Sequence, residues 1–184
     1  MRSGDGLALF CGLLRQHHYL GYRTSVGENM KYLVRDRAGR VVACLLFGSA
    51  AWRAASRDAW LGWDESARQR NLQMLTNNTR FLVLPWMRVP HLASHILSLV
   101  QRRVAADWIA QYGHPVVLLE TFVDSERFRG TCYRAANWIC TGRTTGRSRN
   151  DRHRTLSVPA KDVYVIPLRR DYRRLLGQAG TAVP

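Results

Sequence analysis

Two carboxylates close the apolar segment 115–124 and are the first candidates for catalysis. Glu120 and Asp124 lie four residues apart, so they share one face of a strand, at a strand end where α/β sheets place their sites. Such a pair can act as acid and base, or can hold a divalent ion such as Mg²⁺ for phosphodiester chemistry. The alternative role is structural, because a carboxylate is costly to bury unless a cation such as Arg80 pairs with it.

Tyr133 and Asn137 are the second pair of candidates. They lie four residues apart in a predicted short helix over residues 129–138, so they share a helix face. Together with Glu120 and Asp124 they form the predicted catalytic set. In the alternative interpretation the tyrosine and the asparagine only fasten the helix by hydrogen bonds.

Arginine is concentrated in and before the loop that follows this helix. Residues 127–154 contain eight arginines and one acidic residue, Asp151. Guanidinium groups bind phosphate, and the interleaved glycine, serine and threonine residues let backbone and hydroxyl groups join them. A solvated loop without a ligand is the alternative. The predicted nucleic-acid-binding residues are Arg143, Arg147, Arg149, Arg152 and Arg154.

The composition also favours a phosphate-bearing partner. The 184 residues include 28 basic and 13 acidic ones, which gives a net charge of +15, and only Lys31 and Lys161 are lysine. This charge favours DNA or RNA as a partner, although a genomic bias towards arginine also produces it.

The cysteines and histidines predict no metal site, and no membrane span is expected. The four cysteines show neither a C-x-x-C pair nor a secreted disulfide spacing, and His91 and His95 lack a nearby third ligand. No segment resembles a signal peptide or a membrane span, which favours a cytoplasmic location.

The elements around these residues alternate between strands and helices. We expect one domain over residues 7–176, with a disordered N-terminal end at 1–6 and a flexible tail at 177–184. Pro85 indicates a bulge or splay in its strand, and Pro90 is expected at the first position of the next helix. The sequence therefore predicts an α/β fold, a mixed central sheet flanked by helices. Helices are expected over residues 7–16, 64–75, 91–112 and 129–138, and strands over 30–35, 41–47, 80–89, 115–123, 139–141 and 163–168, with a polar break at 77–79. Two interpretations of Asn77, Asn78, Thr79 and Arg80 stay open: they line the same cleft as Glu120 and Asp124, or they form an Asx turn that leads into the strand.

Residues 88–97 (RVPHLASHIL) resemble the acyl-CoA loop of the GNAT N-acyltransferases, which leads from a splayed strand into a helix and holds pyrophosphate on backbone N–H groups. Arg88 and Ala93 match that pattern, whereas His91 stands where the pattern has a glycine. The resemblance implies that Arg88, His91, Ala93 and Ser94 bind the cofactor. It also implies that Tyr133 protonates the leaving thiolate, since Tyr133-x-x-x-Asn137-Trp138 is similar to the family's Tyr-x-x-x-Gly-Phe.

A longer resemblance extends over nearly the whole chain. The segments HHYLGYR (17–23), NNTRFLVLPWMRVPHLASHIL (77–97), ETFVD (120–124), FRGTCYRAANW (128–138) and GRTTGR (142–147) are similar to the DruA family of the Druantia anti-phage system. Relatives of that family accompany transposases, and the block 130–138 is also similar to the GNAT-like Mom DNA-modification proteins.

These resemblances imply a GNAT-like domain with a splayed sheet, which lacks the first strand of that fold if the chain is a short form of the family. Three functions stay open. The first is an enzyme of an anti-phage or mobile-element system that acts on DNA. The second is a non-catalytic DNA-binding subunit that recruits a helicase or transposase, and the third is an acyl-CoA-dependent N-acyltransferase. The sequence does not identify a cofactor; acyl-CoA and Mg²⁺ are the two candidates that the enzymatic alternatives imply.

Overall fold

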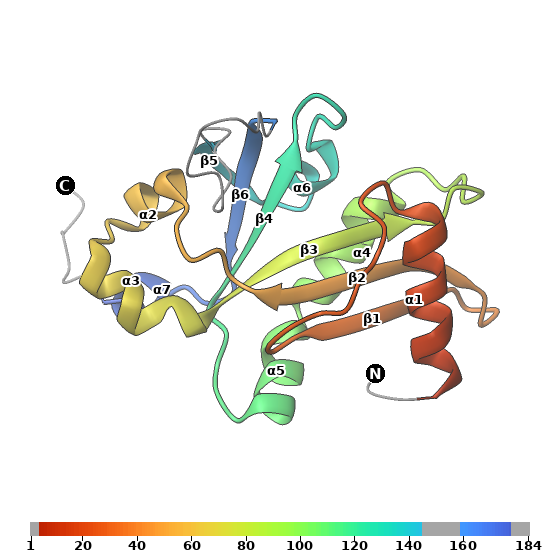
Figure 1. Cartoon of the computed structure of the whole chain (residues 1–184), viewed down its shortest axis with the longest axis horizontal. Coiled ribbons are helices and arrows are strands. Elements are labelled where there is room, and N and C mark those ends of the chain that lie inside the picture. The colour runs from red at the N-terminus through yellow and green to blue at the C-terminus, as the bar shows by residue number, and fades with distance from the viewer. Residues whose placement is uncertain (1–3, 145–158, 178–184) are drawn as a thin grey trace.

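The computed structural model describes residues 4–144 and 159–177. The strands are β1 (Met30–Arg35), β2 (Val41–Ser49), β3 (Leu75–Val83), β4 (Leu118–Asp124), β5 (Ile139–Arg143) and β6 (Lys161–Pro167). The helices are α1 (Asp5–His17), α2 (Ala55–Leu61), α3 (Glu65–Asn71), the 3-10 turn η1 (Leu72–Met74), α4 (Leu92–Gln101), α5 (Val104–Tyr112), α6 (Thr131–Ala135) and α7 (Tyr172–Leu175). The six strands form one sheet in the order β1-β2-β3-β4-β6-β5, which is the predicted mixed sheet flanked by helices (Figure 1).

The sheet opens into a V between β3 and β4. These are the only parallel neighbours among the described strands, and they pair only where Leu75–Asn77 faces Leu118–Glu120. Beyond these residues the two strands diverge, as Figure 1 shows. The splay that Pro85 was expected to cause therefore begins at Asn77, and Pro85 lies beyond the end of β3, where it interrupts no ladder.

The residues predicted as a polar break, 77–79, instead lie inside β3. The pairing with β2 shifts so that Leu46 faces Arg80 and Phe47 faces Asn78, which leaves Thr79 as the extra residue of a β-bulge. The side-chain amide of Asn78 donates to the carbonyl oxygens of Leu46 (3.1 Å) and Arg80 (3.0 Å). The polar side chain thus supplies hydrogen bonds to backbone groups beside the bulge, because buried carbonyl groups require partners.

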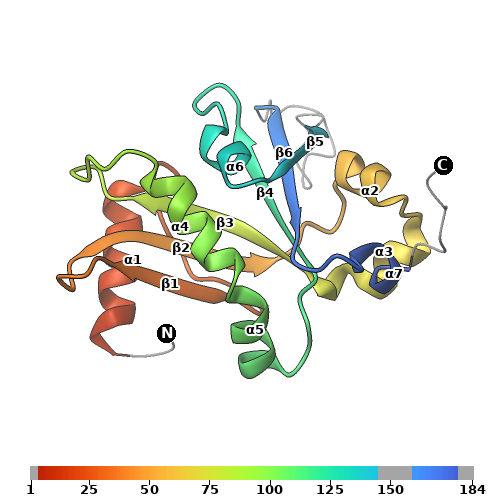
Figure 2. The ribbon, with the colours of Figure 1, turned by 180° about the vertical axis from the view of Figure 1, so that it is seen from behind.

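Helices cover both faces of the sheet (Figures 1 and 2). On one face α4 and α5 pack on Leu45 and Phe47, whereas on the other α1 packs on Cys44 and Leu46. Successive side chains of a strand point to opposite faces, so a strand covered on both faces reads as a continuous apolar run, as β2 does. Beside β4 and β6, a third cluster joins α2, α3 and α7 through Leu61, Trp63 and Leu176, among others.

Several element boundaries differ from the prediction. The helix expected over 91–112 is two helices, α4 and α5, separated at Arg102–Arg103, and Pro90 lies before the N-cap of α4 instead of at its first position. Helix α1 begins at Asp5, inside the end that was expected to be disordered, and α2 and α7 were not predicted. The helix expected over 129–138 is confined to α6.

Two further observations concern the described residues only. No strand precedes β1 between residue 4 and its first residue, Met30. No helix in the same part of the chain has the length and apolar character needed to cross a membrane.

Candidate functional site

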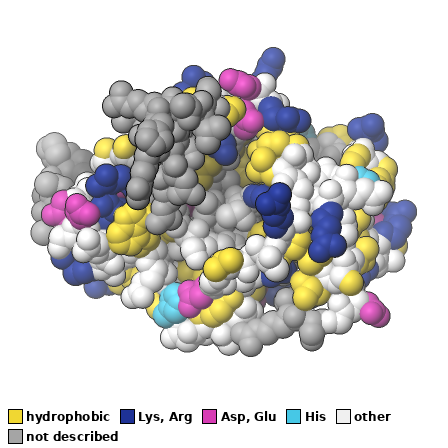
Figure 3. Space-filling model, in the orientation of Figure 1, with side chains coloured by type: hydrophobic (Ala, Val, Ile, Leu, Met, Phe, Trp, Pro, Cys, Tyr) yellow, Lys and Arg dark blue, Asp and Glu magenta, His cyan; other side chains and the backbone are white. Residues whose placement is uncertain are grey.

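A cleft of about 830 Å³ lies where β3 and β4 diverge. Residues 17–20, which include the last residue of α1 and the three that follow it, line one side of it, and the loop from β4 to α6 lines another. In the orientation of Figure 1, basic and hydrophobic side chains are interspersed over the surface and acidic ones are fewer (Figure 3). The side chains that matter below are His18, Tyr19, Asn77, Asn78, Arg80, Asp124, Phe128 and Tyr133, all of which line the cleft.

Tyr133 lies on α6 and its hydroxyl group donates a hydrogen bond to Oδ1 of Asn78 at 2.9 Å. Burial raises the pKa of Tyr133, so the phenol keeps its proton at neutral pH. Since Asn78 is itself fixed by its bonds to the backbone at the bulge, the tyrosine is held in one position. Tyr133 is therefore a neutral proton donor whose present acceptor is an amide oxygen.

The start of α6 is held close to the sheet by Gly130. This glycine has a φ of 63°, and a Cβ atom there would lie 2.7 Å from Cζ of Tyr164. The ring of Tyr164 in turn stacks on that of Tyr133, with centroids 5.8 Å apart. Only glycine permits both the backbone conformation and the close approach that place Tyr133 beside the cleft.

Glu120 does not line the cleft but is fully buried beside its vertex. One carboxylate oxygen accepts a hydrogen bond from Nη1 of Arg57 at 2.7 Å, and the other accepts from the backbone N–H of Ala51 at 2.6 Å. Burial raises the pKa of Glu120, whereas Arg57 and the Ala51 amide oppose that rise. The structural role considered for this residue is thus present, with Arg57 instead of Arg80 as the cation.

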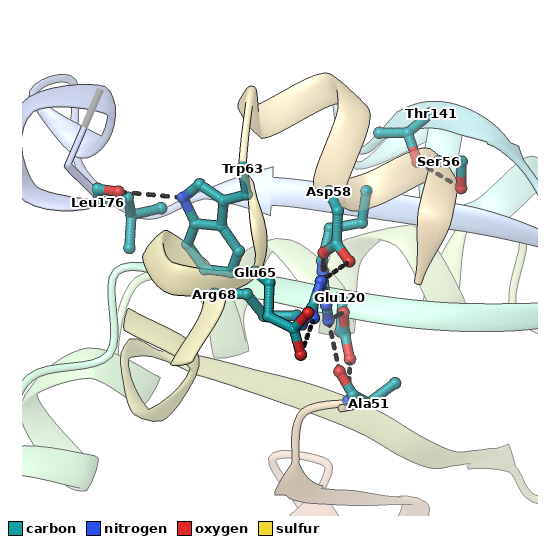
Figure 4. Close-up of polar contacts among 10 residues, drawn as sticks. Ala51, Ser56, Asp58, Trp63, Glu65, Arg68, Glu120, Thr141 and Leu176 are labelled. Carbon is teal, nitrogen blue, oxygen red and sulfur yellow. Dashed lines mark hydrogen bonds and ion pairs between the residues drawn. The ribbon is translucent and has the colours of Figure 1, made fainter. Parts of the chain in front are cut away.

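Arg57 connects Glu120 to a second carboxylate and a second arginine. Its Nε and Nη2 atoms donate to Asp58 at 2.8 and 2.6 Å, and Arg68 lies 3.4 Å from the other oxygen of Asp58 (Figure 4). The buried part of the cluster therefore holds two cations and two anions, and the exposed Glu65 lies 3.6 Å from Arg68 at its edge. This cluster fastens α2 and α3 to β4 at the point where the sheet divides.

Asp124, at the end of β4, stays at the cleft. Its Oδ1 atom accepts from the N–H of Glu126 at 3.1 Å, and its carbonyl oxygen accepts from the N–H groups of Arg127 and Phe128. The carboxylate thereby shapes the turn that carries Phe128 to the cleft. Its charge also raises the pKa of Tyr19, after the larger effect of burial.

Arg80 is a cation without an acidic partner among the described residues. Its Nε atom donates to the carbonyl oxygen of Gly21 at 3.0 Å and its Nη1 atom to that of Thr79 at 2.7 Å. Carbonyl groups thus accept from two of its three nitrogen atoms but leave its charge uncompensated. Burial and this charge lower the pKa of the neighbouring His18 to about 4, so His18 is neutral at pH 7.

The remaining predicted catalytic residue lies apart from the cleft. Helix α6 ends at Ala135, so Asn137 shares no helix face with Tyr133, contrary to the sequence interpretation. Asn137 is exposed and has a φ of 64°, in the left-handed region that asparagine tolerates. The structure thus brings Tyr133 and Asp124 together at the cleft and places Glu120 and Asn137 elsewhere.

The arginines predicted to bind nucleic acid are described only in part. Arg143 lies on β5, where its Nε atom pairs with Asp162 at 2.7 Å. The other four, Arg147, Arg149, Arg152 and Arg154, lie outside the described residues.

Of the residues predicted to bind a cofactor, Ala93 lines the cleft, whereas Arg88, His91 and Ser94 do not. His91 is the N-cap of α4 and has a φ of 58° and a ψ of 8°. A histidine therefore adopts the left-handed conformation that favours glycine, at the position where the GNAT loop has a glycine. The first turn of α4 leaves backbone N–H groups without helical acceptors, and Ala93 belongs to that turn.

Sequence reasoning missed the role of Arg57, which lies in a segment without a recognisable pattern. Arg80 was expected either to pair with Glu120 or, together with Asn77 and Asn78, to line the cleft, and the structure places these three residues at the cleft. The position of Arg80 inside the long motif 77–97 was a further indication. Among the described residues, no group of three or more His, Cys, Asp or Glu side chains could hold a metal ion.

Comparison with known proteins agrees with this architecture. The family model described as Druantia protein DruA matches residues 3–158. No curated protein sequence matches the chain. The structure is similar to spermidine N-acetyltransferase from Vibrio cholerae in complex with CoA and spermine, with a TM-score of 0.57, 8% identity, and coverage of 90% of this chain and 92% of that one.

A second structure of the Vibrio cholerae enzyme SpeG, in complex with manganese ions, gives a TM-score of 0.57 at 7% identity and covers 94% of this chain and 93% of that one. A chimera of SpeG and hSSAT gives 0.51 at 7% identity, with coverage of 76% and 67%. The predicted GNAT-like fold is confirmed by these similarities, which at such low identity concern the fold alone.

Replacement of Arg57 by methionine should destabilise the protein, because it leaves the Glu120 carboxylate buried without its cation. We expect the free energy of unfolding to fall by about 3–5 kcal/mol in urea denaturation. The double variant R57M/E120M should recover most of this loss, since apolar side chains then fill the space. R40M, which breaks an exposed ion pair with Asp36, serves as control and should leave the unfolding midpoint unchanged. An equal effect of R57M and R40M would contradict the role given to the buried pair.

Titration of His18 followed by NMR should give a midpoint near pH 4. The folded-state pKa lies below the ordinary value of 6.5, so the unfolded chain takes up the proton first as the pH falls. His18 therefore lowers the stability of the fold progressively between about pH 6.5 and about pH 4. R80Q should raise the midpoint, because it removes the positive charge. A midpoint near 6.5 in the parent protein would disprove the burial and electrostatics described for this residue.

Proposed function

Because the chain belongs to the Druantia DruA family, we propose that it is a nucleic-acid-binding protein of an anti-phage defence system that acts on DNA through the cleft between β3 and β4. The observation that carries this proposal is Arg80, a partly buried cation that faces the cleft and has no acidic partner among the described residues. A phosphate group is the natural counter-ion, since charge-assisted hydrogen bonds from guanidinium to phosphate are strong.

The wider distribution of charge supports the same ligand. Arg129 and Lys161 also line the cleft, and Arg127 lies at its edge. The acidic residues Glu120 and Asp58, by contrast, are neutralised inside the Arg57 cluster and do not reduce the positive charge at the cleft. With a net charge of +15, the whole chain would attract a polyanion at long range.

The cleft also offers groups for proton transfer. Tyr133 holds a proton at its hydroxyl group, and Asp124 presents a carboxylate at the same cleft. As an enzyme the protein would use Asp124 to accept a proton and Tyr133 to donate one while Arg80 holds the phosphate. As a non-catalytic subunit that recruits a helicase or transposase, it would use Arg80 in the same way and would tolerate Y133F without loss of defence.

Replacement of Arg80 by glutamine should weaken binding of a labelled DNA oligonucleotide about tenfold in fluorescence anisotropy, since one phosphate contact is lost. The slope of log affinity against log salt should also fall by about 1. R40Q removes the same charge from the turn between β1 and β2, where the arginine pairs with Asp36, and should bind like the parent. If R80Q and R40Q lost the same DNA affinity, the loss would be due to the lower net charge and not to a contact at the cleft. Binding that is absent, or insensitive to salt, would overturn the proposed function.

A second candidate function is acyl-CoA-dependent N-acylation. The observation that favours it is the start of α4, where His91 adopts the glycine-like conformation and Ala93 faces the cleft. If this holds, acetyl-CoA should raise the melting temperature, because a ligand that binds only the folded state stabilises it. H91G should preserve the shift, since glycine adopts this φ without strain, and acetate alone should give none. No shift at millimolar acetyl-CoA would exclude this candidate.

A further inference from the structure

An aromatic rim stands at the mouth of the cleft. It consists of Tyr19, from the segment after α1, and Phe128, from the loop between β4 and α6. Their ring centroids lie 5.3 Å apart with 60° between the planes, yet 38% of Tyr19 and 47% of Phe128 remain exposed. Burial of such rings would be favourable, so two large rings left exposed beside a charged cleft indicate a surface that a ligand covers.

Two further side chains contact the ring of Tyr19 in this rim. The ring of His18 stacks on Tyr19 with centroids 4.9 Å apart, and the guanidinium carbon of Arg127 lies 4.8 Å from the Tyr19 ring centroid. Aromatic rings with arginine beside them are the platforms on which unpaired bases stack in single-stranded nucleic-acid sites. Arg80, in the same cleft, supplies the charge for the adjoining phosphate.

The vertex of the cleft holds an unsatisfied polar group. Oδ1 of Asn77 is buried and accepts no hydrogen bond from the described residues, although Asn77 lines the cleft. A buried acceptor without a donor is costly, and a ligand N–H group would remove that cost. A side-chain amide offers one acceptor and one donor group side by side, the pattern with which asparagine reads the edge of a base.

We infer that the cleft binds one unpaired nucleobase, stacked on the rim of Tyr19 and Phe128 and read at its polar edge by Asn77. This inference rests on the proposed function and names its ligand more narrowly. The base is either part of a DNA strand or part of a free nucleotide, since both present the same ring and phosphate. Bases within a duplex are stacked and paired, so DNA must present a single strand, or a base turned out of the helix.

Anisotropy measurements with four probes test the inference. The probes are a labelled single strand, the same strand in a perfect duplex, the same duplex with one unpaired base, and labelled AMP. The parent protein should bind the single strand and the duplex with the unpaired base at least tenfold more tightly than the perfect duplex. Y19A should weaken binding to these two probes about five- to a hundredfold and leave perfect-duplex binding unchanged.

Matched variants separate stacking from damage to the fold. Y19F keeps the ring and should bind like the parent, and F128A should act in the same direction as Y19A. W52A removes an aromatic side chain that is 44% exposed but does not line the cleft, and it should leave every affinity unchanged. N77A should reduce binding to the probes with unpaired bases. A melting temperature of N77A equal to that of Y19F would show that the fold is intact.

The outcomes distinguish this inference from the function on which it rests. Equal affinity of the parent for single strand and perfect duplex, unaltered by Y19A, would overturn the inference and leave DNA binding through Arg80 in place. Binding of AMP but of no DNA probe, with loss in Y19A, would support the base site and overturn the proposed DNA function. A loss of affinity in W52A as large as that in Y19A would overturn the assignment to the rim.

Discussion

The buried ion pair between Glu120 and Arg57 is the constraint on which the cleft depends. Glu120 is the last residue of β4 that pairs with β3, opposite Asn77, so it lies where the two strands cease to share hydrogen bonds. Arg57 and the amide of Ala51 satisfy its two oxygens from the side of α2. These partners make the burial of the Glu120 carboxylate tolerable and so stabilise the vertex of the V. Above the vertex β3 and β4 no longer pair, and the cleft lies between them.

A second set of contacts determines what the open part of the V contains. The bulge at Thr79 and the amide of Asn78 adjust β3 to β2, and Asn78 then fixes the hydroxyl group of Tyr133. Gly130 lets α6 approach the sheet closely enough for this bond to form. The hydroxyl group of Tyr133 is therefore held by a side chain that is itself bonded to the backbone, so its position is fixed before any ligand binds.

The arginines near the cleft differ in whether an acidic side chain compensates their charge. Acidic partners neutralise Arg57 and Arg68 inside the protein, whereas carbonyl oxygens hold Arg80 and leave its charge free to act on the cleft. Burial lowers the pKa of His18 most, and the charge of Arg80 lowers it further, since a proton on His18 would repel Arg80. A phosphate bound as proposed would compensate the charge of Arg80 and weaken its effect on the pKa of His18, so such binding would be coupled to protonation of His18.

The sequence by itself determined several of the local elements, the overall charge and the family resemblance. The hairpin of β1 and β2, the apolar run of β4 and the cap of α3 by Asp64 follow from periodicity and capping, which depend on neighbours along the chain. Only the tertiary structure decided that Glu120 pairs with Arg57, 63 residues away, and that the splay begins at Asn77. Residues 77–79 were predicted to interrupt the strand because they are polar. Asn78 instead bonds to the backbone of β2, and such a bond leaves no periodic pattern of apolar residues in the sequence. Such pairings depend on which segments meet in space, and a pattern of neighbouring residues carries no information about that.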